Sequence, residues 1–378
     1  MTKLRIAQID TAAIHASMYR DSLVFLGDEV EIVGFFDPEP ESEAVRSKIK
    51  DDVAHVPFYA TVEELLERAK PDAVMVSGYC RDMPGWLLQA AEAGVHVWVD
   101  KPFAVHSDQL VPVKAAIERN NLAFSCGYSW RFDPTSRLIK ETYDAGLLGR
   151  GFATEIRYFG GNLLKSDLSH WRFDPALSGG GMLNWLGCHW VDLMRYWTSA
   201  EVTEVTAIEA NINGVPVKVE DTAFVSLRFA NGMLGSLSIG NLLPSGSENT
   251  FRLFGSQGSV SWAPVDERCT IVSTTREWEA APRRVFEIPR AKLPGYGGAG
   301  AALLRAFFGQ IRGEGPSGFV IDDAIESLRI IEAAHESART GRTISLSKDA
   351  VEKLKGLGRE VWDGVDVQAY IDQERDAW

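Results

Sequence analysis

The segment Val97–Pro102 constrains the fold of this chain strongly, because a short apolar run ends abruptly in an acid, a lysine and a proline. Such a run, entered from Gly94, predicts a buried strand of a parallel sheet. Pro102 has no N–H to donate, so strand pairing stops there. Asp100 and Lys101 are then expected at the carboxyl end of a strand, the edge at which open α/β sheets bind ligands. The alternative is a solvated Asp-Lys pair in a loop.

Strand and helix patterns alternate along residues 1–127, which predicts an α/β domain with a doubly wound parallel sheet. The predicted strands are Leu4–Ile9, Val30–Phe36, Ala73–Val76, Val95–Val99 and Ala123–Cys126. The predicted helices are His15–Leu26, Thr61–Ala69 with a capping box at Thr61 and Glu64, Pro84–Ala93, and Ser107–Arg119. A domain of this kind normally binds a dinucleotide.

Residues 128–346 alternate differently and predict an α+β domain with a large open antiparallel sheet. Its predicted strands are Gly151–Gly161, Val202–Ile212, Asp221–Phe229, Met233–Ile239, Thr250–Phe254, Ser259–Trp262 and Thr270–Thr274. Asn231-Gly232 is a strong signal for a hairpin. Its predicted helices are Pro134–Ala145, Asn184–Tyr196, Ala301–Ile311 and Ile321–Ala338. Residues 347–378 are amphipathic and charged, and we expect a helical tail without a chemical role.

Composition limits the possible partners. The net charge of −13 and the lack of a basic block argue against nucleic acid and against an anionic membrane surface. The four cysteines are widely spaced, which predicts reduced thiols in a cytoplasmic protein. No apolar run is long enough to span a bilayer, and no signal peptide is expected. No metal site is predicted.

The acid-Lys-Pro motif at Asp100, Lys101 and Pro102, set in this two-domain organisation, resembles the Gfo/Idh/MocA oxidoreductases over roughly residues 4–346. That resemblance implies a Rossmann domain joined to a domain with an open antiparallel sheet. It also implies an NAD(P)-dependent oxidoreductase that acts on a sugar, a polyol or a related hydroxy compound. Lys101 would be the catalytic lysine, and both Asp100 and Lys101 would contact the cofactor.

The first turn departs from the family, because Asp10, Ala12 and His15 stand in the three glycine slots of G-x-G-x-x-G. Asp10 places a carboxylate where a phosphate belongs, which costs on the order of a kcal/mol or more. Alternatively, Asp10 simply caps the following helix. A protonated His15 would offset part of the negative charge. We still expect the turn to contact a dinucleotide through Asp10, Thr11, Ala12, Ala13 and Ile14.

Two further positions bear on the cofactor. Asp37 follows the second predicted strand. An acid at this position holds the ribose diol of adenosine and favours NAD over NADP. The alternative is that Asp37 belongs to an ordinary Asp-Pro turn. Gly78 and Tyr79 are expected to line the nicotinamide side. Met83 lies near the slot where the family has a histidine.

A second motif begins with Gly179–Gly181, which free the backbone to approach a ligand. On the helix that follows, Trp185 and His189 are four residues apart and share a face, with Asp192 three further on. The family has an aspartate where this chain has Trp185. We expect His189, together with Lys101, to move a proton to or from a hydroxyl. The alternative is a packed histidine satisfied by Asp192.

Aromatic rings and hydrogen-bond donors gather around these motifs, as suits sugars and polyols, which stack on rings and hydrogen-bond at their edges. The predicted substrate-binding residues are Tyr128, Arg131, His170, Trp171, Arg172, Asn184, Trp185 and His189. The alternative for the tryptophans is a place in the core or in a subunit interface. The open sheet predicts a homo-oligomer, either a dimer or a tetramer.

A second hypothesis starts from the family residues that this chain lacks: the three glycines of the first turn, the histidine near Met83 and the aspartate at Trp185. If their loss abolished nicotinamide chemistry, the same architecture would be a diverged sugar-binding, regulatory or non-redox protein. In one version of this hypothesis a metal is bound by Asp10, His15, Asp100 or His189, but such scattered ligands are a weak signal.

Overall fold

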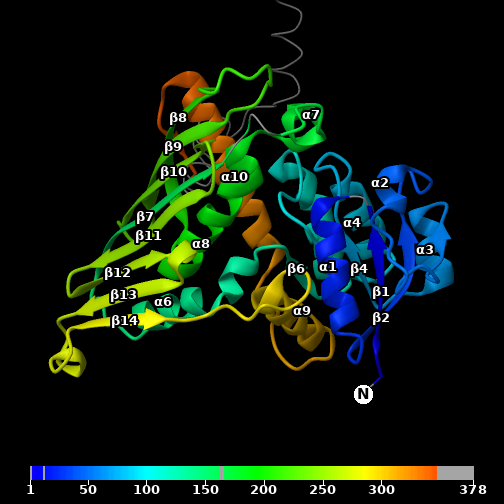
Figure 1. Cartoon of the computed structure of the whole chain (residues 1–378), viewed down its shortest axis with the longest axis horizontal. Helices are drawn as coiled ribbons and strands as arrows, with labels where there is room; N and C mark the ends of the chain where they lie inside the picture. Colours follow the sequence, from blue (N-terminus) through cyan, green and yellow to red (C-terminus); the bar gives the residue numbers. More distant parts are fainter. Residues whose placement is uncertain (1, 12, 162, 164–165, 347–378) are drawn as a thin grey trace, which may run out of the picture.

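The computed structural model describes residues 2–11, 13–161, 163 and 166–346. The predicted cofactor contact at Ala12 and the predicted tail, 347–378, lie outside these residues. The chain forms two lobes, with the N-terminal lobe built around one sheet and the C-terminal lobe around another (Figure 1). Among the described residues, no helix combines the length and the apolar character needed to cross a membrane.

The first sheet has six strands in the order β3-β2-β1-β4-β5-β6, and every neighbouring pair is parallel. This order confirms the predicted doubly wound sheet. The strands are β1 (Leu4–Ile9), β2 (Val30–Phe36), β3 (Phe58–Tyr59), β4 (Ala73–Val76), β5 (His96–Val99) and β6 (Phe124–Cys126). The helices are α1 (Ile14–Phe25), α2 (Glu43–Arg46), α3 (Val62–Ala69), α4 (Met83–Glu92) and α5 (Val111–Arg119).

Local sequence signals account for several of these boundaries. Helix α3 starts at the predicted cap, where the Glu64 N–H donates to Thr61 Oγ1 at 3.1 Å. The Glu64 carboxylate accepts from the Ala60 N–H at 3.0 Å, so both halves of the cap are satisfied. Strand β5 ends at Val99, and Lys101-Pro102 follows as a cis peptide. Asp100 and Lys101 therefore leave the sheet at its carboxyl edge, as the sequence predicts.

The second sheet has nine strands in the order β14-β13-β12-β11-β7-β10-β9-β8-β15. They are β7 (Gly151–Gly161), β8 (Val202–Ala210), β9 (Thr222–Phe229), β10 (Leu234–Leu243), β11 (Ser247–Gly255), β12 (Gly258–Ala263), β13 (Arg268–Ser273), β14 (Arg283–Glu287) and β15 (Ile344–Ser345). The prediction of a purely antiparallel sheet needs one correction, because β7 and β10 are parallel. Strand β7 lies between β11 and β10. The sequence could not predict the parallel pair, because side chains alternate between the two faces in the same way whichever direction a strand runs.

Helices cover one face of this sheet. They include α6 (Pro134–Asp144), α8 (Cys188–Thr198) and α10 (Ile321–Thr340), which lie between the sheet and the Rossmann lobe (Figure 1). The short helix α7 (Pro175–Ser178) precedes the glycine motif, and α9 (Gly297–Ile311) lies against the first lobe, where its contacts include α1. Tryptophans that were not site candidates fill the core: Trp98, Trp190, Trp197 and Trp262 are fully buried.

Candidate active site

Lys101 is buried at the interface of the two lobes. Its Nζ donates to the main-chain carbonyl of Trp185 at 2.8 Å and lies 4.3 Å from the centre of the Trp185 ring. Lys101 follows β5 of the first sheet, whereas Trp185 belongs to the segment that leads into α8. The two predicted motifs, 84 residues apart, are therefore joined by one hydrogen bond and one cation–π contact.

A regular helix was predicted over Asn184–Tyr196, and this prediction was wrong at its start. Residues Leu183–Gly187 form a π-helical turn, and α8 begins only at Cys188. Such turns occur often at functional sites. Glu220 fixes the entry to the turn, because its carboxylate accepts from the N–H groups of Gly181 and Leu183, each at 2.8 Å. A Cβ at Gly181 would lie 2.0 Å from the Glu220 carbonyl oxygen, so this close approach requires glycine.

His189 lies in the first turn of α8 and is buried. Its pKa is lowered well below the ordinary histidine value, first by burial and then by the charges of Lys101 and His15. Asp192 does not satisfy His189 as the alternative interpretation proposed, because its carboxylate binds Arg131. Among the described residues, Nδ1 of His189 has no hydrogen-bond partner.

A small cavity holds the candidate chemistry. Its lining residues come from the carboxyl edge of the first sheet and from the second lobe: Ala13, His15, Gly78, Asp100, Lys101, His170, Trp171 and Trp185. Its volume is about 10 Å³, which is room for one water molecule. The structure thus brings together eight residues, of which seven were predicted site residues. The eighth, His15, was predicted only as a counter-charge or as a metal ligand.

A larger cavity of about 270 Å³ shares one wall with the first, the Trp185 side of the π-helical turn. Arg172, Asn241 and Glu220 supply polar groups, whereas Tyr158, Met182 and Leu186 are among its apolar walls. Of the predicted substrate-binding residues, Arg172 and Trp185 line this space. Its size and mixed lining suit a small polar ligand with an apolar face.

The dinucleotide turn is only partly suited to its expected ligand. Helix α1 begins at Ile14 with no side-chain cap at Ala13, although the Ala16 N–H already donates to the Ala13 carbonyl at 3.0 Å. Asp10 has a φ of 60° and accepts from the Ala13 N–H at 3.4 Å, close to the capping role of the alternative interpretation. A Cβ at Gly78 would lie 2.4 Å from Asp10 Oδ2, so the carboxylate crosses the turn towards the end of β4.

Asp37 was predicted to hold a ribose diol. Its Oδ2 already accepts from both the N–H and the hydroxyl of Thr11 at 2.8 Å, and its Oδ1 accepts from the Glu39 N–H at 3.0 Å. It lies at the expected end of β2, and a carboxylate keeps further lone pairs for a diol. The ribose position therefore fits a dinucleotide, whereas the Asp10 carboxylate lies in the turn that would hold the diphosphate. The nicotinamide position does not fit it in this conformation, since Trp171 and Trp185 close the cavity to the size of one water molecule.

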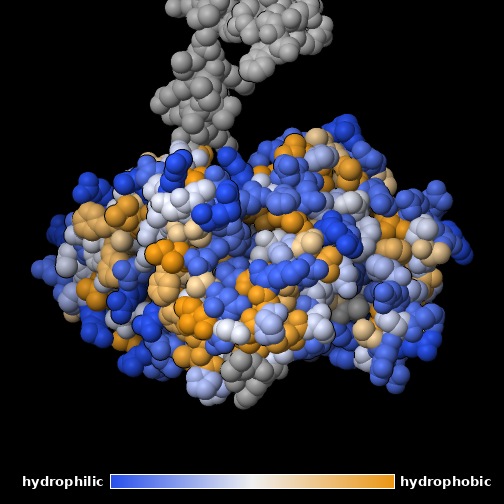
Figure 2. All heavy atoms as spheres, turned by 90° about the horizontal axis from the view of Figure 1, so that it is seen from above, coloured by the Kyte–Doolittle hydropathy of each residue, from blue (hydrophilic) through white to orange (hydrophobic). Residues whose placement is uncertain are grey.

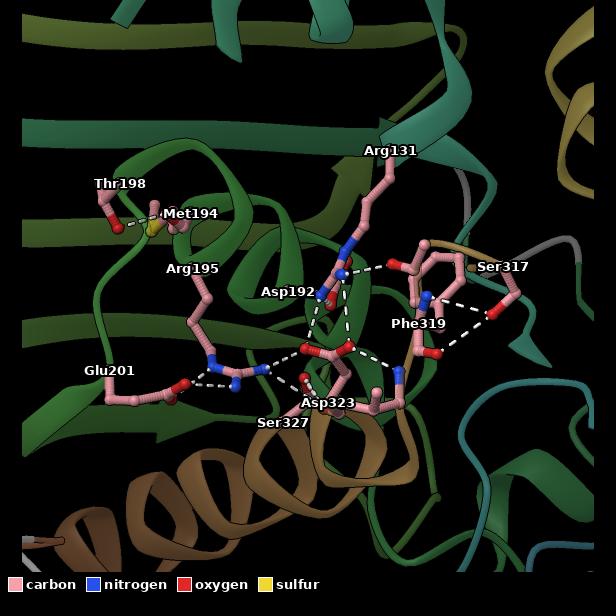
Figure 3. A network of polar contacts seen from close by, with 12 residues as sticks. Arg131, Asp192, Met194, Arg195, Thr198, Glu201, Ser317, Phe319, Asp323 and Ser327 are labelled. Atoms are coloured by element: carbon pink, nitrogen blue, oxygen red, sulfur yellow. Dashed lines mark hydrogen bonds and ion pairs between the residues drawn. The ribbon is translucent and has the colours of Figure 1, made fainter. Parts of the chain in front are cut away.

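Four of the predicted substrate-binding residues line neither of these two cavities: Tyr128, Arg131, Asn184 and His189. Arg131 is buried, and its guanidinium binds Asp192 and Asp323 (Figure 3). Burial alone would lower the pKa of Arg131, but the two carboxylates raise it overall. Tyr128 is fully buried, with its ring 5.6 Å from that of His189. Arg131 instead lines a separate cavity of about 360 Å³, and Tyr128 packs against the ring of His189.

Two other predicted residues occupy intermediate positions. Asn184 is buried, and its Oδ1 contacts Nε2 of His335 at 2.6 Å. Nδ1 of His335 lies 2.9 Å from Glu209, so a hydrogen-bonded chain supports the π-helical turn from α10 and β8. Tyr79 is partly exposed, and its ring centre lies 5.2 Å from that of Trp171.

The sequence analysis predicted no metal site. The one version of the second hypothesis that included a metal named Asp10, His15, Asp100 or His189 as its ligands. In the described part of the chain, Glu209, Glu220 and His335 are the group whose ligand atoms lie within 4.8 Å of one another. Glu220 and His335 already hold the π-helical turn, and Glu209 holds His335. The group is thus explained by its internal hydrogen bonds. No local signal in the sequence could have found it, because its members are spread over three elements.

Comparison with known proteins agrees with this architecture. The model of the oxidoreductase family with an NAD-binding Rossmann fold matches residues 7–128, and the model of the GFO/IDH/MocA C-terminal domain matches residues 136–261. The class is therefore a two-domain oxidoreductase with a Rossmann domain. The chain belongs to the Gfo/Idh/MocA family.

The names of several relatives indicate enzymes that act on sugars or cyclic polyols. A myo-inositol 2-dehydrogenase of Thermotoga maritima is 23% identical over 304 residues, which is 80% of this chain and 87% of the relative. A levoglucosan dehydrogenase of Pseudarthrobacter phenanthrenivorans is 28% identical over 203 residues, 46% of this chain and about half (50%) of the relative. A solved levoglucosan dehydrogenase in complex with NADH and levoglucosan has a TM-score of 0.79 at 20% identity and covers 92% of this chain and 100% of its own. This last likeness shows the fold.

Proposed function

We propose that this protein is an NAD(P)-dependent oxidoreductase that acts on a CH–OH group of a sugar, a polyol or a related hydroxy compound, with NAD as the favoured cofactor. The observation that carries the proposal is a buried lysine amine at the carboxyl edge of the Rossmann sheet, in one cavity with Asp100 and His15. The family names support this proposal over a non-redox alternative.

The cofactor would be held by the turn before α1 and by Asp37, and the negative charge of Asp37 disfavours the 2′-phosphate of NADP. When bound, nicotinamide accepts or supplies a hydride. The residues of this chain do the remaining work. Lys101 is placed to hold and polarise the substrate oxygen, since its Nζ retains N–H donors beyond the one that binds Trp185.

Binding requires the cavity to open. Trp171 and Trp185 make an edge-to-face contact with ring centres 5.5 Å apart, and both line the small cavity. Displacing the Trp185 side chain would join the small cavity to the larger one, because Trp185 lines both. The larger cavity then offers Arg172 and Asn241 to the hydroxyl groups of a sugar or polyol. Closure over the substrate would exclude water from the hydride transfer.

We also propose that the protein is a homo-oligomer that covers the open face of the second sheet. Large apolar side chains are exposed on its strands: Phe152 on β7, Ile208 on β8, Phe224 on β9, Leu234 on β10 and Val285 on β14. Apolar patches also lie between hydrophilic residues on the upper face of the molecule (Figure 2). Of these side chains, Ile208 and Phe224 are paired neighbours on β8 and β9, and exposed apolar side chains that gather on one face mark association sites.

The test is an absorbance assay of NADH formation from NAD⁺, with myo-inositol and levoglucosan as probes. We expect turnover with a compound of this class and a loss of at least ~100-fold in Lys101→Ala, the scale of a lost proton-handling group. Lys50→Ala removes an exposed lysine paired with Asp21 and serves as the matched control. Equal turnover by the Lys101 variant and the wild type would remove Lys101 from the mechanism.

A further inference from the structure

Arg172 is a half-buried cation that lines the larger cavity, the one of about 270 Å³. Its guanidinium carbon lies 4.7 Å from the centre of the Phe173 ring and 6.0 Å from the centre of the Trp185 ring. Burial lowers the pKa of Arg172, although the charge of Asp167 opposes this shift. In the described part of the chain, the guanidinium has neither a hydrogen-bond acceptor nor an ion-pair partner. Because buried charges are ordinarily paired, Arg172 keeps its donors for a ligand.

Two acids line the same cavity, but this chain already engages their oxygens. The Glu220 carboxylate accepts from two main-chain N–H groups, each at 2.8 Å, and the charge of His335 favours its ionised form. The Asp221 carboxylate accepts from two main-chain N–H groups at 3.0 and 2.8 Å and from the Thr222 hydroxyl at 2.9 Å. The demand of both acids for donors is therefore met inside the protein, and neither acid pairs with Arg172.

The remaining polar groups of the cavity offer mainly donors. The side-chain amide of Asn241 and the hydroxyl of Tyr158 make no hydrogen bond to any residue that the structure describes. Burial raises the pKa of Tyr158, so its hydroxyl keeps its proton at neutral pH. Arg172 is the only cation among the described lining residues. One cation neutralises a carboxylate, whereas a phosphate group carries a charge of about −1.5 to −2 at pH 7.

We propose that the substrate is a sugar acid, a polyhydroxy compound with one carboxylate, and that Arg172 binds this carboxylate. A guanidinium matches the plane of a carboxylate and binds it through two parallel N–H···O bonds. Asn241 and Tyr158 bind hydroxyl groups of the same ligand. The inference rests on the proposed function for the oxidation of a hydroxyl group, but binding of the acid needs no nucleotide. The structural alternative is an arginine that merely stacks on Phe173 and Trp185.

The first experiment measures binding to the full chain without nucleotide, by isothermal titration calorimetry at low ionic strength. Three pairs of probes differ only by a carboxylate in place of a CH₂OH group: D-gluconate and D-glucitol, D-glucuronate and D-glucose, D-galacturonate and D-galactose. We expect at least one acid to bind ~10-fold or more tightly than its neutral partner, the scale of a hydrogen-bonded charge. D-Glucose 6-phosphate should bind more weakly than that acid. Equal affinities within all three pairs, or tighter binding of the phosphate, would overturn the inference.

The second experiment repeats the titrations with variants. Arg172→Met should lose the preference for the acid, and Arg172→Lys, which keeps the charge but not the planar fork, should retain part of it. Arg228→Met is the matched control, because Arg228 pairs with Glu204 on the exposed sheet surface, and it should keep the full preference. An unchanged preference in Arg172→Met would show that Arg172 only stacks on its neighbours.

Turnover with NAD⁺ separates this inference from the proposed function. Acid binding that depends on Arg172, without oxidation of any probe, would retain the carboxylate site and reject the oxidoreductase. Oxidation of a neutral sugar at least as efficiently as its acid, with kcat/KM unchanged in Arg172→Met, would retain the oxidoreductase and reject the carboxylate site. If both hold, Arg172→Met should raise KM for the acid by ~10-fold or more and change kcat much less.

Discussion

Removing the Arg131 side chain should destabilise the second lobe severely. Its guanidinium donates to Asp192 from Nε at 2.9 Å and to Asp323 from Nη2 at 3.0 Å, and Nη1 also donates to the Gly318 carbonyl at 3.1 Å. In Arg131→Met, Asp192 keeps a fully buried carboxylate whose hydrogen-bonded cation is gone. Breaking a buried ion pair from one side costs about 3–5 kcal/mol. For a domain of this size the melting temperature falls on the order of 10 °C.

The pH dependence of this loss has a definite sign. Burial raises the pKa of Asp192 to about 6, although the charge of Arg131 opposes the rise. Between the unfolded value of 3.8 and this pKa, the folded state binds more protons, so stability falls as the pH rises through that window. Without Arg131 the pKa rises further. The destabilisation should therefore be largest near pH 8 and should shrink on acidification as Asp192 becomes neutral.

Urea denaturation followed by tryptophan fluorescence, at about pH 8 and about pH 5, measures both effects. Arg228→Met is the matched control, because Arg228 pairs with Glu204 on the exposed sheet surface. That pair should contribute no more than about 1 kcal/mol. A loss below about 1 kcal/mol in Arg131→Met, or a loss that does not depend on pH, would refute the proposed role of the buried pair.

Two further predictions concern Asp37 and His335. Asp37→Asn keeps an acceptor for Thr11 but removes the negative charge. The preference for NADH over NADPH should therefore fall about tenfold, or about 1.4 kcal/mol, in competitive titrations. An unchanged ratio of the two affinities would exclude a role for this charge. Burial lowers the pKa of His335, but the hydrogen bond to Glu209 and the charge of Glu220 outweigh it and raise the pKa overall. Its stabilising contribution is complete below the unfolded value of 6.5 and is lost as the pH rises through the folded pKa, so His335→Gln should lose more stability at pH 6 than at pH 9.

Regular local patterns were enough to predict most of the fold. Alternation of strand and helix gave the parallel sheet, and the acid-Lys-Pro motif gave the position of Lys101 at its edge. The two-residue strands β3 and β15 were missed, because so short a segment has no measurable period. The parallel pairing of β7 with β10 was missed because it depends on the order in which strands join the sheet.

The candidate site was predicted less completely, because its contacts join residues far apart in sequence. Arg131 stands among aromatic residues and resembles a ligand donor, but its partners Asp192 and Asp323 lie 61 and 192 residues away. His15 reaches Asp100 across 85 residues, which no motif of either segment indicates. The π-helical turn at Trp185 likewise depends on Glu220, which lies in a loop after β8.

Binding of NADH to the purified full chain tests the central claim most directly. Energy transfer from tryptophan to the reduced nicotinamide should be strong, because Trp171 and Trp185 line the cavity that the ring must enter. We predict a saturable signal with one NADH per chain and weaker binding of NADPH. A titration with no saturable signal for either dinucleotide would contradict the assignment of this cavity to nicotinamide chemistry.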